Sequence, residues 1–328
     1  MRKLKAVLVV SSMISVLMIT FSLSSVAVGK EFRIGINNFG QANFFARIGR
    51  SVMIDEVKKQ GGVPISTVTD NVPDRIKAIE TFMAQGVDAI IIQEGDIKMA
   101  DPALREAAKK GIIIASMGAG MSEYVDVGVE SNEWVMGAMA ASELMDRLSK
   151  AGKAARIVEI YNPLGQMIRI RRQELHAVMT EYPDSKIVAG FVYAWPDFFP
   201  DIKSKMEAVL GANPEPGSIN AVFATFDGAG VAAASAIREA GRQDEIIIVG
   251  IDGDPQAYEE MSKPDSPFVA TVAQQPWLMA RTVVDKVFQL LKEKELPRDH
   301  FYISVELATK EDLPPKSEWP YPENYPRK

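Results

Sequence analysis

Short runs of β-branched residues alternate with amphipathic stretches along most of the chain, from Phe32 to about Phe301. The runs have the length of buried strands, and the stretches between them repeat their apolar positions with the period of a helix. Strands that alternate with helices form a parallel sheet whose faces the helices cover. The pattern therefore predicts an α/β fold, in which ligands bind beyond the carboxyl ends of the strands.

The predicted elements follow one another through two rounds of strand and helix, with a break near residue 130. Strands are predicted at 32–37, 63–68, 88–92, 112–115, 125–129, 156–160, 186–191, 221–224, 246–249, 268–273 and 301–305. Helices are predicted at 43–60, 71–85, 101–110, 131–148, 167–182, 202–210, 229–240, 255–261 and 277–294. No Pro/Ser-rich linker separates the two rounds, so we expect two similar lobes in tight connection. The first lobe is predicted to comprise 30–130 plus about 275–302, and the second 131–273 plus about 303–308.

The two ends of the chain differ from this pattern. Residues 1–29 combine a basic start, an apolar middle and small residues at the exit, which predicts a secretory signal peptide cleaved near Ala27 or Gly29. The apolar stretch is long for a signal peptide, and an uncleaved membrane anchor is the alternative. Residues 309–328 form a tail with five prolines and three aromatic residues. We expect this tail to dock on the body through its aromatic residues, the alternative being a loose end.

Composition excludes several classes of function. The chain has no Cys and only two His, His176 and His300, which excludes disulfides, thiol nucleophiles and most zinc sites. Its net charge of −6 is unlike that of a nucleic-acid-binding protein. No Ser elbow or Walker loop is present, and no two carboxylates stand out as a hydrolytic pair. We therefore expect no catalysis and no cofactor.

Aromatic residues follow two predicted strands. Asn43, Phe44 and Phe45 follow the first strand, and because neighbouring helical residues point about 100° apart, one ring is expected in the core and the other over the strand ends. A hydrophobic staple is the alternative. After 186–191, Trp195 belongs to a group of four aromatic residues within seven, which suits the C–H faces of a sugar or the closing of a core.

Polar residues follow other strands. Asp252 can accept two hydrogen bonds from ligand hydroxyls, because Asp254 is available to cap the helix at 255–261. Asp227 is the weaker candidate, since it could cap the next helix. Gln274 offers both a donor and an acceptor after 268–273. Three arginines, of which Arg169 is the first, stand near a helix start, where a positive charge opposes the helix dipole and hints at function.

A glycine-rich segment, Gly228-Ala229-Gly230, follows a strand and opens a helix, as a dinucleotide-binding turn does. It lacks the spacing of the third glycine and lies late in the chain. Close packing of helix on sheet explains these small residues better.

The chain resembles the periplasmic sugar-binding proteins of ABC transporters, in particular the ribose-binding group with the type I fold. The resemblance covers about 31–307 and is carried by Asn43-Phe44-Phe45, Val249-Gly250-Ile251-Asp252-Gly253 and Ala270-Thr271-Val272-Ala273-Gln274. It implies two lobes joined by three hinge crossings that close on one ligand. The ligand residues that it implies are Phe44 or Phe45, Gln93, Arg169, Asp252 and Gln274, with Trp195 close to an aromatic position of the family.

Two regions depart from the ribose-binding pattern. Ser116-Met117-Gly118-Ala119 stands where an Asp-Arg pair is expected, and Phe226-Asp227 stands where an Asn-Asp pair is expected. The pocket should therefore be larger and less polar than one for ribose. A deoxy sugar, a polyol, a larger or modified sugar and a non-sugar molecule all remain possible, and the candidate site includes Met117, Phe226 and Asp227.

The resemblance implies an exported, monomeric solute-binding protein of the periplasm that delivers its ligand to the permease subunits of an ABC importer. Three alternatives belong to other functional classes. The first is an exported sensor of the same fold that signals to a membrane receptor kinase, and the second is an enzyme. The third is a transcription regulator of this fold, but it would need an N-terminal DNA-binding headpiece in place of the predicted signal peptide.

Overall fold

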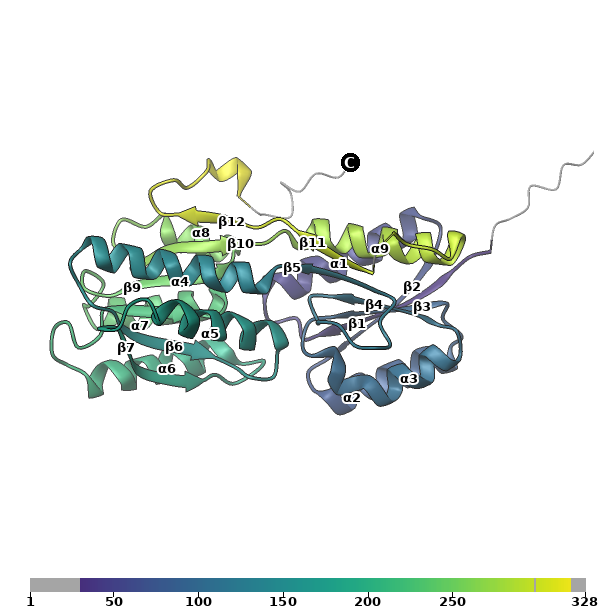
Figure 1. Cartoon of the computed structure of the whole chain (residues 1–328), viewed down its shortest axis with the longest axis horizontal. Coiled ribbons are helices and arrows are strands. Elements are labelled where there is room, and N and C mark those ends of the chain that lie inside the picture. Colours follow the sequence, from purple (N-terminus) through teal and green to yellow (C-terminus); the bar gives the residue numbers. More distant parts are fainter. Residues whose placement is uncertain (1–29, 298, 320–328) are drawn as a thin grey trace, which may run out of the picture. The chain divides into compact units, whose positions relative to one another are not determined.

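The computed structural model describes residues 30–297 and 299–319. The expected signal peptide lies outside the described residues, and so does the end of the Pro-rich tail. Two sheets, each layered between helices, make up the compact unit that begins at Phe32 (Figure 1). The structure is therefore an α/β fold of two lobes, as predicted.

The first sheet has six parallel strands in the order β11-β5-β4-β3-β1-β2. Its strands are β1 (Arg33–Phe39), β2 (Val63–Thr69), β3 (Ala89–Gln93), β4 (Ile113–Met117), β5 (Val127–Ser131) and β11 (His300–Ile303). Helices α1 (Phe44–Lys59) and α9 (Pro276–Glu293) pack on one face. Helices α2 (Val72–Ala84) and α3 (Asp101–Lys109), with the short 3-10 helix η1 (Ile97–Ala100), cover the other.

The second sheet has the order β12-β10-β9-β8-β6-β7, and only β12 is antiparallel to its neighbour. Its strands are β6 (Arg156–Tyr161), β7 (Lys186–Val192), β8 (Ala221–Ala224), β9 (Ile247–Asp252), β10 (Phe268–Ala273) and β12 (Glu306–Thr309). Helices α4 (Glu133–Lys150) and α5 (Gln166–Met179) cover one face. Helices α6 (Phe198–Ala212), α7 (Asp227–Glu239) and α8 (Pro255–Met261) cover the other.

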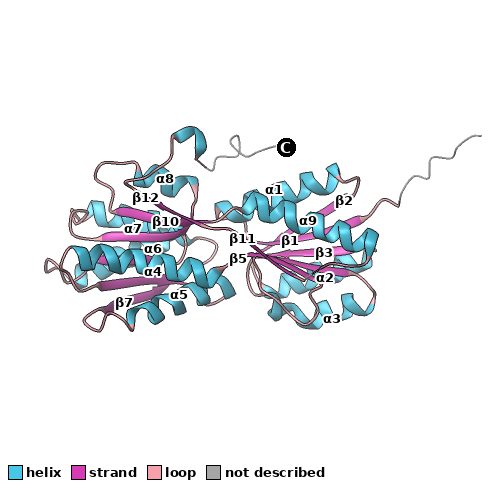
Figure 2. Cartoon of the chain, turned by 45° about the horizontal axis from the view of Figure 1, so that its top comes forward, coloured by secondary structure: helices cyan, strands magenta, loops and turns pink. Residues whose placement is uncertain are grey.

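The central strands are mostly apolar because helices cover both faces of each sheet (Figure 2). In β3, Ile91 packs against α1 and α9, whereas Ile90 and Ile92 pack against α2 and α3. In β9, Ile248 and Val249 divide in the same way between the two helix layers of the second lobe. This two-sided burial produces the uninterrupted β-branched runs of the sequence.

The chain crosses between the two sheets three times. It leaves the first sheet after β5, returns after β10 by way of α9, and leaves again between β11 and β12. The single strand predicted at 301–305 is therefore wrong, because the chain changes sheet at Ser304 and Val305. The predicted start of the helix at residue 202 is also wrong. Helix α6 begins at Phe198, since Pro200 lies in its first turn, where proline is tolerated.

The described part of the tail docks on the second lobe, as expected. Trp319 is buried, lies 5.9 Å from the ring of Tyr258 and donates a hydrogen bond from Nε1 to the Pro314 carbonyl oxygen at 2.8 Å. The tyrosines of the tail, Tyr321 and Tyr325, lie outside the described residues. Among the helices that the structure describes, none has the length and apolar character needed to cross a membrane.

Candidate ligand-binding site

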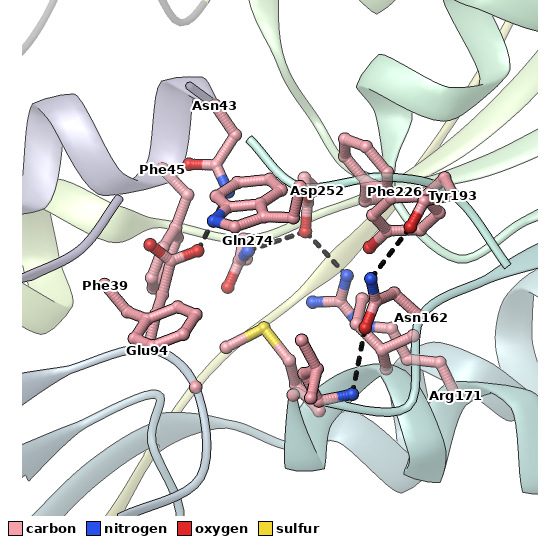
Figure 3. A pocket seen from close by; sticks show the side chains of 16 residues that line it. Phe39, Asn43, Phe45, Glu94, Asn162, Arg171, Tyr193, Phe226, Asp252 and Gln274 are labelled. Atoms are coloured by element: carbon pink, nitrogen blue, oxygen red, sulfur yellow. Dashed lines mark hydrogen bonds and ion pairs between the residues drawn. The ribbon is translucent and has the colours of Figure 1, made fainter. Parts of the chain in front are cut away.

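A cavity lies between the two lobes at the carboxyl ends of the strands of both sheets (Figure 3). It contains about 590 Å³ of empty space, part of which is open to solvent. Its lining comes from the ends of β1, β3, β6, β7, β8, β9 and β10, from the start of α1 and from the first two turns of α5. The lining residues are Phe39, Asn43, Phe45, Glu94, Gly95, Asn162, Leu164, Gly165, Met167, Ile168, Arg171, Tyr193, Trp195, Phe226, Asp252 and Gln274. This is the place where open α/β sheets bind ligands.

The two lobes are in contact at the mouth of this cavity. Arg169 of the second lobe places Nη2 2.5 Å from Oδ2 of Asp96 in the first lobe. The backbone N–H of Gln166 donates to the Gly95 carbonyl oxygen at 3.3 Å. The cavity is thus partly closed by side chains and backbone from both lobes.

Asn43 connects the start of α1 to the cavity. Its Oδ1 accepts a hydrogen bond from the N–H of Ala46 at 2.7 Å, which caps the helix. Its Nδ2 donates to Oε1 of Glu94 at 2.9 Å. The two neighbouring phenylalanines diverge, since Phe45 lines the cavity and Phe44 packs beside Ile48 in a separate small cluster.

Arg171 lies fully buried at the centre of a charged network. Its Nε is 2.6 Å from Oε2 of Glu133, and its Nη1 is 2.9 Å from Oδ1 of Asp252 and 2.8 Å from the Thr225 carbonyl oxygen. Burial alone would lower the pKa of Arg171, but the charges of Glu133 and Asp252 outweigh burial and raise the pKa above its usual value. Arg171 is therefore a fixed cation with carboxylates on two sides.

Asp252 and Gln274 join this network to the hinge. Oδ1 of Asp252 accepts from Nε2 of Gln274 at 2.7 Å, and Oε1 of Gln274 accepts from Oγ of Ser131 at 3.1 Å. Burial raises the pKa of Asp252. Because Ser131 ends β5 and Gln274 follows β10, these bonds tie together two of the three crossings between the lobes.

Glu94, which the sequence analysis missed, is the acidic residue of the first lobe in the cavity. It follows β3 in the left-handed backbone region at φ 58°, and its carbonyl oxygen accepts from Nη1 of Arg75 at 2.8 Å. Burial raises the pKa of the Glu94 carboxyl to about 8, although the hydrogen bond from Asn43 lowers it. The signal available in the sequence was its place directly after a strand, beside the candidate Gln93.

Aromatic rings cover much of the cavity wall. Trp195 stacks on Phe198 with ring centroids 5.9 Å apart, and Tyr193 packs against Phe226 at 5.1 Å. Tyr193 belongs to the aromatic loop after β7, and its pKa is raised by burial. Such walls bind the C–H faces of a ligand.

Some of the predicted ligand residues line the cavity, and others do not. The cavity is lined by Asn43, Phe45, Trp195, Phe226, Asp252 and Gln274. Outside its lining lie Phe44, Gln93, Met117, Arg169 and Asp227. Arg171, two residues beyond Arg169, occupies the place inside the cavity, while Arg169 lies at the mouth.

The predicted residues outside the lining have contacts of their own. Gln93 donates from Nε2 to the Phe45 carbonyl oxygen at 3.1 Å and accepts from Asn38, so it holds the start of α1 in place. Met117 packs in the core between β4 and the helices α1 and α9. The Asp227 carboxylate accepts from Oγ1 of Thr271 at 2.7 Å and from the N–H of Asp254 at 2.8 Å.

Neither aspartate that was considered as a helix cap makes a capping hydrogen bond with its side chain. Asp227 is the first residue of α7 and its carboxylate bonds to β10 and to the start of α8, while Phe226 takes the cap position. Asp254 occupies the cap position of α8, but its side chain makes no capping hydrogen bond. Burial and the charge of Asp252 raise the pKa of Asp227 to about 7.

Three buried polar atoms of the lining have no hydrogen-bond partner among the described residues. They are Oε2 of Glu94, Nη2 of Arg171 and Nε1 of Trp195. Buried polar groups in proteins are almost always satisfied, so atoms left open at a cavity are suited to a polar ligand. The arrangement thus offers one acceptor and two donors beside aromatic faces.

Within 30–297 and 299–319, no group of three or more His, Asp or Glu side chains is placed to hold a metal ion. The chemistry that the cavity offers is hydrogen bonding, charge and aromatic contact.

Comparison with known proteins places the chain among binding proteins. The family described as periplasmic binding protein domain matches residues 34–295. The chain is 26% identical over 277 residues to the ribose import binding protein of Bacillus subtilis (strain 168). This alignment covers 82% of this chain and 85% of the relative. It is also 26% identical over 276 residues to the xylitol-binding protein of Mycolicibacterium smegmatis, covering 83% of this chain and 75% of the relative.

A solved structure has the same fold. It is an ABC transporter solute binding protein from Agrobacterium vitis with bound allitol, and it matches with a TM-score of 0.79 and 30% sequence identity. The match covers 86% of this chain and 96% of that protein.

Proposed function

Because the chain belongs to the periplasmic binding protein family and has its type I fold, we propose that it binds a sugar or sugar-like polyol in the cleft between its lobes and delivers it to the permease of an ABC importer. The observation that carries the proposal is the set of three open polar atoms, on Glu94, Arg171 and Trp195, in an aromatic-walled cavity. Hydroxyl groups complete such hydrogen bonds, and the rings contact the carbon skeleton.

The relatives support this class of ligand. Ribose, xylitol and allitol, which appear in their names, are all small polyhydroxylated molecules. Transport-associated binding proteins of this kind are not enzymes, and this chain is proposed to release its ligand chemically unchanged. It would act as an exported monomer, directed to the periplasm by the leader predicted at 1–29.

Hinge closure is the proposed mechanism. The three crossings allow the lobes to separate, and the contact between Arg169 and Asp96 forms only when the lobes approach each other. A ligand favours the closed form only through the contacts that it gains there. In the cleft, these contacts come from Glu94 of one lobe and from Arg171 and Trp195 of the other.

A thermal-shift screen of sugars and polyols tests the proposal. A ligand present at one hundred times its Kd stabilises the native state by about 2.7 kcal/mol, which raises the Tm on the order of 5 °C. We expect such a shift with at least one sugar or polyol, and mass spectrometry of the released ligand should show no chemical change. Turnover of the ligand would refute the proposal, as would the absence of any shift across the screen.

A matched pair of variants locates the binding. Trp195→Ala should lose at least tenfold in affinity because it removes a ring of the cavity wall. Phe199→Ala removes an exposed ring nearby that does not line the cavity, and should bind as the wild type does. Equal effects of the two substitutions would place the ligand elsewhere.

A further inference from the structure

We propose that the ligand carries a basic nitrogen and that the Glu94 carboxylate binds this ammonium group among Phe39, Phe45 and Trp195. The ligand class is then an amino sugar or an amino polyol. This inference rests on the proposed function, since it concerns the same cleft, and it names a feature that ordinary neutral sugars lack.

The first support is the geometry of Glu94. The residue is 6% exposed and lines the cavity, and its Oε1 accepts from Nδ2 of Asn43 at 2.9 Å. Its Oε2 is buried and has no hydrogen-bond partner in the part of the chain that the structure describes. Figure 3 shows the carboxylate beside Asn43, Phe45 and Phe39.

Arg75 lies close to Glu94, but no hydrogen bond joins its guanidinium to the Glu94 carboxylate. Arg75 directs Nη1 and Nη2 to the carbonyl oxygens of Glu94 and Gln93, both at 2.8 Å, and its Nε to Oδ1 of Asn37. Arg75 therefore fixes the backbone that presents Glu94. Each of its three nitrogens donates to a main-chain or amide oxygen, and none of these three bonds reaches the Glu94 carboxylate.

The second support is the excess of acidic groups around the cleft. Among the residues that the structure describes, five buried acidic residues interact electrostatically here with two buried arginines, Arg75 and Arg171. The acidic residues are Glu94, Glu133, Asp227, Asp252 and Asp254. Burial raises the pKa of each of these five carboxyls, and the charge of Asp252 raises the pKa of the other four further. A cationic ligand would favour the ionised form of these carboxyls, whereas an anionic ligand would disfavour it further.

The third support is the aromatic wall. Cations are attracted to the faces of Trp and Phe, and most strongly in desolvated sites. The protein already uses Phe39 in this way, because the guanidinium carbon of Arg75 lies 4.8 Å from the centre of that ring. Trp195 stacks with Phe198 on one side while lining the cavity. An ammonium group beside Glu94 would thus meet a carboxylate and ring faces together.

The competing possibility is a neutral hydroxyl at the same place. A hydroxyl can bond to Glu94 in either its protonated or its ionised form, whereas an ammonium group requires the ionised form. Burial raises the pKa of Glu94 to about 8, so an amine bound at pH 7 must displace a proton from this carboxyl. The groups that shift the pKa of Glu94, besides burial, are Asn43, Arg75, Arg171 and Asp252. The charges of Arg75, Arg171 and Asp252 act on Glu94 in the ligand-free protein as well.

The experiment compares matched pairs of ligands by isothermal titration calorimetry at pH 7 in 0.15 M salt. The pairs are D-sorbitol with 1-amino-1-deoxy-D-sorbitol, D-glucose with D-glucosamine, and D-galactose with D-galactosamine. We expect at least one amine to bind ten times or more tightly than its hydroxyl partner. Glu94→Gln should remove this preference, whereas Glu207→Gln, the same change on an exposed surface of α6, should keep it.

Proton release gives a second measurement. Titration in buffers of different ionisation enthalpy should show release of about one proton per bound amino polyol by the wild type and none by Glu94→Gln. Thermal melting of ligand-free Glu94→Gln checks that the variant is folded. Neutral members that bind as tightly as their amines would overturn the inference and leave the proposed function in place. If Glu94→Gln weakens the binding of the amine and of its hydroxyl partner equally, the inference is likewise overturned and the proposed function stands. If no compound of the pairs or of the wider screen binds, both proposals are overturned.

Discussion

The buried guanidinium of Arg171 lies 2.9 Å from the carboxylate of Asp252, although 81 residues separate them in the sequence. The same guanidinium lies 2.6 Å from Glu133 at the start of α4. One arginine of α5 therefore holds together the end of β9 and the first helix of the second lobe, in the wall of the cavity.

Arg171→Ala is expected to destabilise the ligand-free protein by about 3–5 kcal/mol, because it leaves two buried carboxylates without their cation. Urea unfolding followed by circular dichroism measures the loss. Arg169→Ala is the matched control on the same helix. Its ion pair with Asp96 is 39% exposed on the arginine side, so about 0–1 kcal/mol is expected. Equal losses in the two variants would contradict a structural role for Arg171.

These two arginines also show where prediction from the sequence reaches its limit. The strand–helix alternation predicts the two sheets. Asp252 ends β9 and Gln274 follows β10, so their place at the carboxyl edge follows from the fold alone. Arg169 and Arg171 are about 200° apart on one helix. Which of them enters the cavity depends on how α5 starts at Gln166, a tertiary detail that periodicity does not contain.

Glu94 and β12 were missed for related reasons. Glu94 reaches the cavity because its backbone takes φ 58° and because Asn43, 51 residues earlier, holds its carboxyl. Neither condition leaves a local signal. Strand β12 has four residues, none of them buried, so it lacks the apolar alternation by which strands are recognised. Its pairing with β10 follows from the third crossing between the lobes.

The stability of the ligand-free protein should depend on pH through Glu94. Its pKa is about 8 in the folded state against a usual 4.5, so the folded state binds the proton more tightly than the unfolded state does. The stability that protonation provides is complete below about pH 4.5 and is lost as the pH rises through 8. Glu94→Gln should therefore melt above the wild type at pH 8.5 and close to it at pH 4.5. Its stability gain at the higher pH is expected to be on the order of a few kcal/mol.

Differential scanning calorimetry of both proteins across this range measures the difference. Glu207→Gln on the exposed face of α6 should follow the wild type at every pH. If the melting temperatures of Glu94→Gln and the wild type differ by the same amount at every pH, the pKa of Glu94 is the same in the folded and unfolded protein.

The docked tail is expected to contribute to stability. Trp319→Ala removes a buried ring that packs on Tyr258, and we expect a loss of about 3 kcal/mol in the free energy of unfolding. Trp134→Ala is the matched control, because this ring on α4 is 46% exposed and should change stability by no more than about 0.5 kcal/mol. Urea unfolding of both variants separates the cases, and a loss for Trp319 as small as that for Trp134 would mean that the tail is not held in solution.

Closure of the cleft can be obstructed at Gly40, which follows β1 in the first lobe. A β-carbon at Gly40 would lie 2.7 Å from the rigid indole of Trp195 in the second lobe. Gly40→Ala should therefore oppose the closed form and weaken ligand binding at least tenfold. Gly111→Ala carries the same backbone strain, since φ is +81° at Gly40 and +73° at Gly111, but a β-carbon there meets no atom within 4 Å. The two variants should lose similar stability without ligand, because the strain of a left-handed backbone is common to both, and only Gly40→Ala should lose affinity by calorimetry. Wild-type affinity in Gly40→Ala would mean that binding does not require Trp195 to approach the end of β1.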